Sequence, residues 1–105
     1  MPPPKPWQRQ ESRLANITGG TRNAGSGNGW VRKADVRALG KLIEAKWTKH
    51  KQFPLKLADL QELEHHAVID NRLPVFCIEF QDKHGRHRYV VLREDDYFDD
   101  DPRIA

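Results

Sequence analysis

The sequence predicts an α/β fold in which helices pack against a mixed β-sheet. Apolar residues recur at helical spacing in two segments, whereas in four others they alternate or form the short runs typical of strands. These segments follow the order helix, β, β, helix, β, β, and Thr21-Arg22 can add a short strand after the first helix. Such an order is typical of an α/β sandwich, in which the helices bury their apolar stripes on a sheet.

The first helix is expected over residues 7–17, after a Pro-rich arm at residues 1–6 that is extended or unstructured. Its inner side should hold Trp7, Leu14 and either Arg13 or Ile17. Glu11 precedes Leu14 by about one turn, so its carboxylate should lie close to the buried side. Gly19-Gly20 ends the helix, because glycine readily takes the left-handed conformation of a helix C-terminus.

Residues 30–37 and 41–47 are predicted to form a hairpin that turns at Leu39-Gly40, where glycine accepts a positive φ. Residues paired across this turn have numbers that sum to 79, so Asp35 faces Glu44. One face is then a core face, with Ala34, Val36, Ile43, Ala45 and Trp47. The other face presents Lys33, Asp35, Glu44 and Lys46.

Asp35 and Glu44 are the most informative pair in the chain. Two residues directly opposite lie about 4.5–5.5 Å apart at Cβ, and like charges there are destabilising. A bound hard cation would offset the repulsion. Lys46 follows Glu44 by two residues and so projects from the same face. The alternative is an ordinary solvated face of mixed charge, which is common on antiparallel sheets.

The rest of the chain completes the sheet and its second helix. The expected elements are a flexible Gly-rich loop at 23–29, a basic loop at 48–54, a helix at 57–69, strands at 73–80 and 88–92 joined by a turn at 82–85, and an acidic tail at 94–105. The inner stripe of the second helix should hold Leu57, Leu60, Leu63, Ala67 and His66. In the tail, Tyr97-Phe98 could dock a short helix.

Charge is divided unevenly along the 105 residues. Residues 1–56 hold twelve Lys and Arg and only three acids, a net +9, whereas residues 57–105 hold six Lys and Arg and twelve acids, a net −6, which gives the +3 of the whole chain. A basic half is the pattern expected of a polyanion binder. The three acids in that half are Glu11, Asp35 and Glu44, which suggests a site where phosphate and cation meet.

Two further features bound the function. Cys77 is the only cysteine and lies in an apolar run, so we expect a buried thiol and no internal disulfide. No apolar stretch is as long as a membrane span and no signal peptide opens the chain, so we expect a cytoplasmic protein that does not bind a membrane.

The ordered set of a helical Glu11, Thr21-Arg22-Asn23-Ala24-Gly25-Ser26-Gly27, Asp35 and Ile43-Glu44-Ala45-Lys46 resembles the PD-(D/E)xK nuclease superfamily. Within it the pattern is most similar to the archaeal-type Holliday junction resolvases and their bacteriophage relatives. The resemblance covers roughly residues 9–92 and implies a restriction-endonuclease-like mixed β-sheet flanked by helices, with an αβββαβ core, in one nuclease domain over 1–105. Ala34 stands where the superfamily name has Pro, and residues 28–32 lengthen the loop before Asp35.

The resemblance implies hydrolysis of DNA phosphodiesters with Mg²⁺, for which Mn²⁺ can substitute, and no small-molecule cofactor. Asp35, Glu44 and the Ala45 carbonyl would hold the metal, and Glu11 would complete or water-bridge the site. Lys46 would orient the attacking water and help to deprotonate it. The residues predicted to contact DNA, from the resemblance and from the basic loop, are Arg22, Ser26, Arg32, Lys33, Lys49 and Lys51.

Three functions remain open from the sequence. The first is a resolvase of four-way junctions, which we expect to act as a symmetric homodimer, in the cytoplasm of a bacterial host if a bacteriophage encodes it. The second is a nuclease of the same fold with another DNA substrate, such as a nicking, restriction-like or fork-specific enzyme. The third is a non-catalytic DNA-binding module. Retention of Glu11, Asp35, Glu44 and Lys46 together argues against the third.

Overall fold

A computed structural model describes residues 2–22 and 35–99 of the chain. Its elements are α1 (Pro6–Thr18), β1 (Thr21–Arg22), β2 (Val36–Ala38), β3 (Lys41–Thr48), α2 (Leu57–Asp70), β4 (Leu73–Asp82), β5 (Gly85–Val91) and α3 (Glu94–Tyr97). The predicted helix, strand and hairpin segments are all found among the described residues, together with the short strand at Thr21–Arg22. The predicted loop at 23–29 and the first part of the predicted strand at 30–37 lie outside them.

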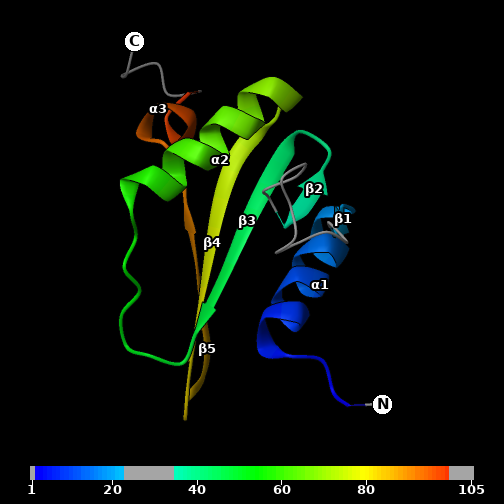
Figure 1. The fold of residues 1–105 in the computed structure, drawn as a ribbon, viewed down its shortest axis with the longest axis vertical. Coiled ribbons are helices and arrows are strands. Elements are labelled where there is room, and N and C mark those ends of the chain that lie inside the picture. The colour runs from blue at the N-terminus through cyan, green and yellow to red at the C-terminus, as the bar shows by residue number, and fades with distance from the viewer. Residues whose placement is uncertain (1, 23–34, 100–105) are drawn as a thin grey trace.

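The five strands form one mixed sheet in the order β1-β2-β3-β4-β5 (Figure 1). Neighbours are antiparallel except β3 and β4, which run parallel and are joined through α2. β3 is therefore the central strand, with partners on both sides. In Figure 1 the ends of β4 and β5 extend beyond both helices, and β5 forms an edge of the sheet.

The turn of the first hairpin confirms the predicted register. Val36 pairs with Ile43 and Ala38 with Lys41, and both pairs sum to 79. Gly40 has a φ of 74°, the left-handed conformation that the tight turn requires of its second residue.

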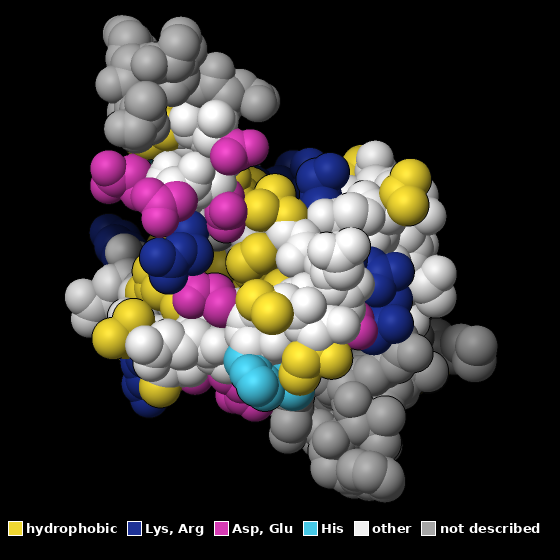
Figure 2. Space-filling model, turned by 90° about the horizontal axis from the view of Figure 1, so that it is seen from above, with side chains coloured by type: hydrophobic (Ala, Val, Ile, Leu, Met, Phe, Trp, Pro, Cys, Tyr) yellow, Lys and Arg dark blue, Asp and Glu magenta, His cyan; other side chains and the backbone are white. Residues whose placement is uncertain are grey.

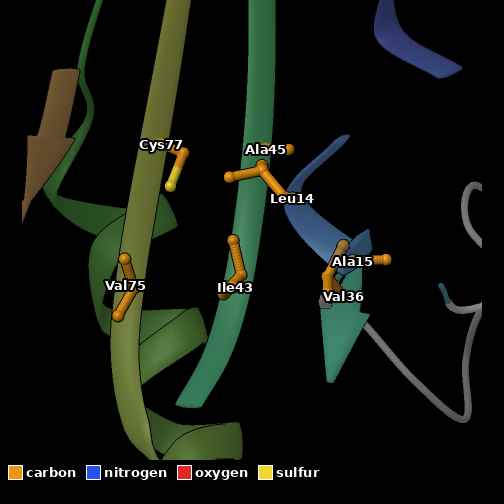
Figure 3. Close-up of a cluster of buried hydrophobic side chains, with 7 residues drawn as sticks. All are labelled: Leu14, Ala15, Val36, Ile43, Ala45, Val75 and Cys77. Atoms are coloured by element: carbon orange, nitrogen blue, oxygen red, sulfur yellow. The ribbon is translucent and has the colours of Figure 1, made fainter. Parts of the chain in front are cut away.

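Two hydrophobic clusters hold the helices to opposite faces of the sheet. On one face α1 packs through Leu14 and Ala15, and Figure 3 shows them beside the side chains of Val36, Ile43, Ala45, Val75 and Cys77. On the other face α2 packs through Leu63 and Ala67 against Leu42, Phe76 and Ile78. The buried Cys77 thiol belongs to the first cluster, as predicted.

The inner sides of both helices differ from the prediction. In α1, Trp7 and Ile17 are exposed, and the buried residues are Gln10, Glu11, Leu14 and Ala15. Two of these four buried residues are polar. A prediction that selects apolar residues for the inner side of the helix therefore missed them and included Trp7 and Ile17 instead. In α2, Leu57 is exposed at the first turn, where the helix has not yet reached the sheet, whereas Leu63 and Ala67 are buried as predicted.

Candidate active site

Three carboxylates approach one another from three parts of the fold. Glu11 comes from α1, Asp35 directly precedes β2, and Glu44 lies in the middle of β3. Asp35 affects the pKa of both glutamates through its charge and through side-chain hydrogen bonds, so it lies between them. The structure thus brings together the three acids of the basic half of the chain.

Asp35 departs from the regular ladder of the hairpin. Its amide donates to the Ile43 carbonyl at 2.9 Å, although Ile43 is already the partner of Val36. Two residues of one strand therefore oppose one residue of the other, which is the geometry of a β-bulge. The expectation that Asp35 pairs regularly with Glu44 is corrected accordingly. Bulges re-aim side chains, and the Asp35 carboxylate accepts a hydrogen bond from the Ala45 N–H at 2.8 Å.

The alternative of an ordinary solvated face does not describe these acids. Asp35 is 8% exposed, and the Glu44 side chain retains 17% of its surface. The reason is the central position of β3, since α2 covers the face that carries Glu44 while α1 covers the other. Lys46 lies further along the same face and is half-buried.

Burial and charge act together on the glutamates. Burial, the charge of Asp35 and a side-chain hydrogen bond with Asp35 together raise the pKa of Glu44 to about 8, while Lys46 opposes the rise. Burial likewise raises the pKa of Glu11, with Asp35 adding to it and Arg22 lowering it. In a buried carboxylate cluster of this kind, each ionisation makes the next one less favourable unless a cation offsets the charge.

Two cations partly neutralise the cluster. Arg22 donates from Nη2 and Nε to the same Glu11 oxygen, at 3.0 and 3.2 Å. The Lys46 Nζ lies 3.7 Å from a Glu44 oxygen. The predicted catalytic lysine is therefore adjacent to a predicted metal ligand, and the predicted DNA contact Arg22 is bonded to another.

Gln10 fixes the strand behind the site, and the sequence analysis missed it. Its amide donates to the Lys46 carbonyl at 2.8 Å and to the Cys77 carbonyl at 3.4 Å, and the side chain is buried. It thus ties α1 to the central strands at the residue that carries the ammonium group. A polar residue next to Glu11 at the start of a helix gave no signal of this role.

A cavity of about 250 Å³ opens beside the site, between β3 and α2. Glu44, Lys46 and Leu63 line it together with Asp59 and Glu62. The sequence analysis also missed Asp59 and Glu62. They precede the predicted core residue Leu63 by four residues and by one residue, and this spacing could have placed them near the sheet.

The donor chemistry suits a hard divalent cation. Within residues 2–22 and 35–99, no three Asp, Glu, His or Cys side chains already surround one point as metal ligands, since Glu11 turns to Arg22 and Glu44 to Lys46. Yet buried carboxylates are the oxygen ligands that Mg²⁺ takes, and a cation there would favour the ionised forms of Glu11 and Glu44, whose pKa values are raised. Asp35, Glu44 and Glu11 fit such an ion by chemistry.

The residues predicted to contact DNA fall in three places. Lys49 and Lys51 are exposed in the loop that follows β3. Arg22 is in β1, and Ser26, Arg32 and Lys33 lie outside the described residues. Acidic side chains gather elsewhere. Glu94, Asp95 and Asp96 lie in the first turn of α3, and Figure 2 shows a group of acidic side chains in its upper left part.

Comparison with known proteins identifies the fold. The sequence matches no protein-family model and no curated protein. Among solved structures, the chain superposes on Hjc, a Holliday junction resolvase from the archaeal hyperthermophile Archaeoglobus fulgidus, with a TM-score of 0.59 and 19% sequence identity. The match covers 77% of this chain and 72% of that one. This chain has the Hjc fold. The predicted αβββαβ core, a mixed sheet with flanking helices, is therefore confirmed.

None of the described helices is both long and apolar enough to cross a membrane.

Proposed function

We propose that this chain is a metal-dependent, structure-selective DNA endonuclease that resolves four-way junctions. One observation carries the proposal. In a fold shared with a Holliday junction resolvase, Asp35 lies between Glu11 and Glu44, and Lys46 lies beside Glu44. A protein that only bound DNA would gain nothing from burying three acids in the basic part of its chain.

Asp35 and Glu44 would hold Mg²⁺, with Glu11 bound directly or through a water. The Ala45 carbonyl is a further candidate ligand, because a strand residue directs its N–H and C=O to the same neighbouring strand and the Ala45 N–H already meets Asp35. When bound, the metal would neutralise charge on the phosphodiester and make a coordinated water more acidic.

The protein's own residues would position the reactants. Lys46 would hold the attacking water near the phosphorus and stabilise charge that develops on the phosphoryl oxygens. The Gln10 amide, which donates to the Lys46 carbonyl, keeps this part of β3 in place. The Ala45 N–H fixes one oxygen of Asp35, so the carboxylate needs little reorganisation to bind the ion.

Arg22 gives Glu11 a partner within the chain. The Glu11 side chain is almost fully buried, and the ion pair offsets the cost of burying its charge at the site. A metal would compete with the guanidinium for that carboxylate, which would free Arg22 to contact the DNA backbone.

The junction as substrate rests on charge and symmetry. The +9 of residues 1–56 favours binding of a polyanion, and Lys49 and Lys51 bring part of this charge to the exposed loop after β3. Resolution of a four-way junction needs two cuts in strands of like polarity, and one chain supplies one site. A two-fold homodimer would supply both sites in a fixed relation, and C2 is the commonest oligomer symmetry.

The proposal is tested by cleavage of a labelled four-way junction beside a linear duplex of the same sequence, with Mg²⁺ or with excess chelator. Lys46→Ala serves as the inactive variant and Lys83→Ala, in the β4–β5 turn, as its matched control. We expect cleavage of the junction only, with Mg²⁺ only, by the wild type and Lys83→Ala. Cleavage of the linear duplex alone would support a nuclease with another substrate, and binding without cleavage in Mg²⁺ would support a non-catalytic module.

A further inference from the structure

A second hollow, of about 600 Å³, lies where the basic loop after β3 meets the exposed end of the β4–β5 hairpin. Six of its lining residues define it here as the hairpin hollow: Lys49, Lys51, Ile78, Phe80, His87 and Tyr89. Its volume is within the range of pockets that take small ligands, about 300–1,000 Å³. The residues of the candidate active site do not line it.

Strand register places the hairpin hollow on the same face of the sheet as Lys46. Lys46 is the partner of Ile78, and Ile78 is the partner of Tyr89. Paired residues of neighbouring strands point to the same side. Because strands lie about 4.8 Å apart, Tyr89 is about 10 Å from Lys46 across the sheet. The hollow therefore continues the candidate active site.

The floor of the hollow is an aromatic platform. Tyr89 is 58% exposed although it lies in a β-strand, and its ring meets the edge of Phe80 at 6.0 Å between centroids and 78° between planes. Residues Gly85 to Val90 of β5 are exposed, and only Val91 at the end of the strand packs against the cluster below α2. An exposed ring held by a second ring offers a flat face to an incoming planar group.

The rim of the hollow is basic. Lys49 and Lys51 are exposed, and neither forms an ion pair with another residue in the described part of the chain. The one acid of the lining, Asp82, is bound to His87 Nε2 at 3.1 Å and accepts a hydrogen bond from the His84 amide at 2.8 Å. An aromatic floor with a cationic rim matches a group that is planar and apolar at one end and anionic at the other.

We propose that the hairpin hollow binds one nucleotide at the branch point, on the DNA strand whose phosphate is cut beside Lys46, once the base of that nucleotide has left its pair. Its base stacks on Tyr89, and its phosphate is held by Lys49 and Lys51. This inference rests on the proposed function, which it deepens by naming a feature of the substrate. A paired base within a duplex hides its faces in the stack, whereas an unpaired base near a branch or an end can present one to a protein ring. A second copy of the chain is the other possible occupant of the hollow. Across a two-fold axis it would bring the positive charges of Lys49 and Lys51 close to the same charges of its partner, whereas a nucleotide brings a negative phosphate.

The experiment measures binding in the presence of chelator, where the DNA stays intact. The probe is a branched oligonucleotide with one unpaired 2-aminopurine at the branch, whose fluorescence falls when the base stacks, and a fully paired duplex is the reference. Tyr89→Ala removes the platform, Tyr89→Phe restores the ring, and Tyr97→Ala removes another exposed tyrosine, on α3, as a matched control. Anisotropy gives the dissociation constants, and sedimentation gives the mass of each variant.

Wild-type protein, Tyr89→Phe and Tyr97→Ala should quench the unpaired base. Tyr89→Ala should not quench it and should bind the branched probe about tenfold more weakly relative to the duplex, as expected for loss of one base–aromatic stack. Unchanged quenching and affinity in Tyr89→Ala would overturn the proposal. The proposal would also be overturned if Tyr89→Ala sedimented with a lower mass than the wild type and lost affinity equally for both DNAs. That result would mean that a second copy of the chain, and not a nucleotide, covers the hollow. Failure of the proposed function would give a different result. Mg²⁺-dependent cleavage would then be absent, while quenching of the unpaired base in chelator would persist.

Discussion

Glu44→Gln should change how the stability of the metal-free protein depends on pH. Burial next to Asp35 raises the pKa of Glu44 from the ordinary value of 4.5 to about 8. The folded protein therefore binds a proton more tightly at this site than the unfolded chain does. The contribution to stability is present below about pH 4.5 and is lost as the pH rises to about 8, because ionisation then favours the unfolded state.

The size of the effect follows from the same shift. A rise from 4.5 to about 8 corresponds to roughly 4–5 kcal/mol at about 1.4 kcal/mol per tenfold, and partial exposure of the side chain reduces it to roughly 3–4 kcal/mol. Glutamine has a similar shape and does not ionise. Wild-type protein should thus lose a few kcal/mol of unfolding free energy between pH 5 and pH 8, and Glu44→Gln should lose much less.

Urea unfolding in chelator at several pH values from 5 to 8.5 measures the difference. Glu94→Gln, which alters an exposed carboxylate on α3, is the matched control and should follow the wild type. Addition of Mg²⁺ at pH 8 should restore stability to the wild type and less to Glu44→Gln, because the ion binds the folded carboxylates. Equal pH slopes for the wild type and Glu44→Gln would refute the reasoning about burial and charge at this residue.

Other predictions concern the same site and the surface beside it. Asp35→Asn and Lys46→Ala should each lower the cleavage rate by at least about 10²-fold in single-turnover assays while DNA binding survives; a wild-type rate in either variant would remove the role given to that residue. Ca²⁺ should support DNA binding without cleavage, because it takes oxygen ligands in a looser geometry than Mg²⁺ does, and turnover with Ca²⁺ would contradict this. Replacing Lys49 and Lys51 together by Ala should weaken binding and flatten its salt dependence by about two units of slope, as measured by titration at several salt concentrations; an unchanged slope would place the DNA elsewhere.

Much of the fold could be predicted because its signals are local. The left-handed turn at Gly40 fixes the hairpin register, and the apolar run that became β4 is long and uninterrupted. The same register, with the resemblance, brought Asp35, Glu44 and Lys46 together. Glu11 was placed near the buried side of α1 from its spacing alone, and the structure confirms that position.

The rest depends on tertiary contacts that local patterns do not carry. The bulge at Asp35 depends on how β2 pairs with β3, and the residue types around Asp35 do not predict it. Burial of Glu44 follows from the central position of β3, whereas alternation alone left open an ordinary solvated face. The carbonyls that Gln10 meets come from two other strands, Lys46 in β3 and Cys77 in β4, so its role becomes visible only when the chain is folded.

The most direct test of the central claim is to map the cuts on an end-labelled four-way junction with Mg²⁺, for the wild type and for Asp35→Asn. The claim is that Asp35, held between Glu11 and Glu44, helps to build a metal-dependent nuclease site. We predict symmetric cuts near the branch in two strands of like polarity, with 5′-phosphate ends, and none with Asp35→Asn. The same cuts by Asp35→Asn, or by the wild type in excess chelator, would contradict the claim.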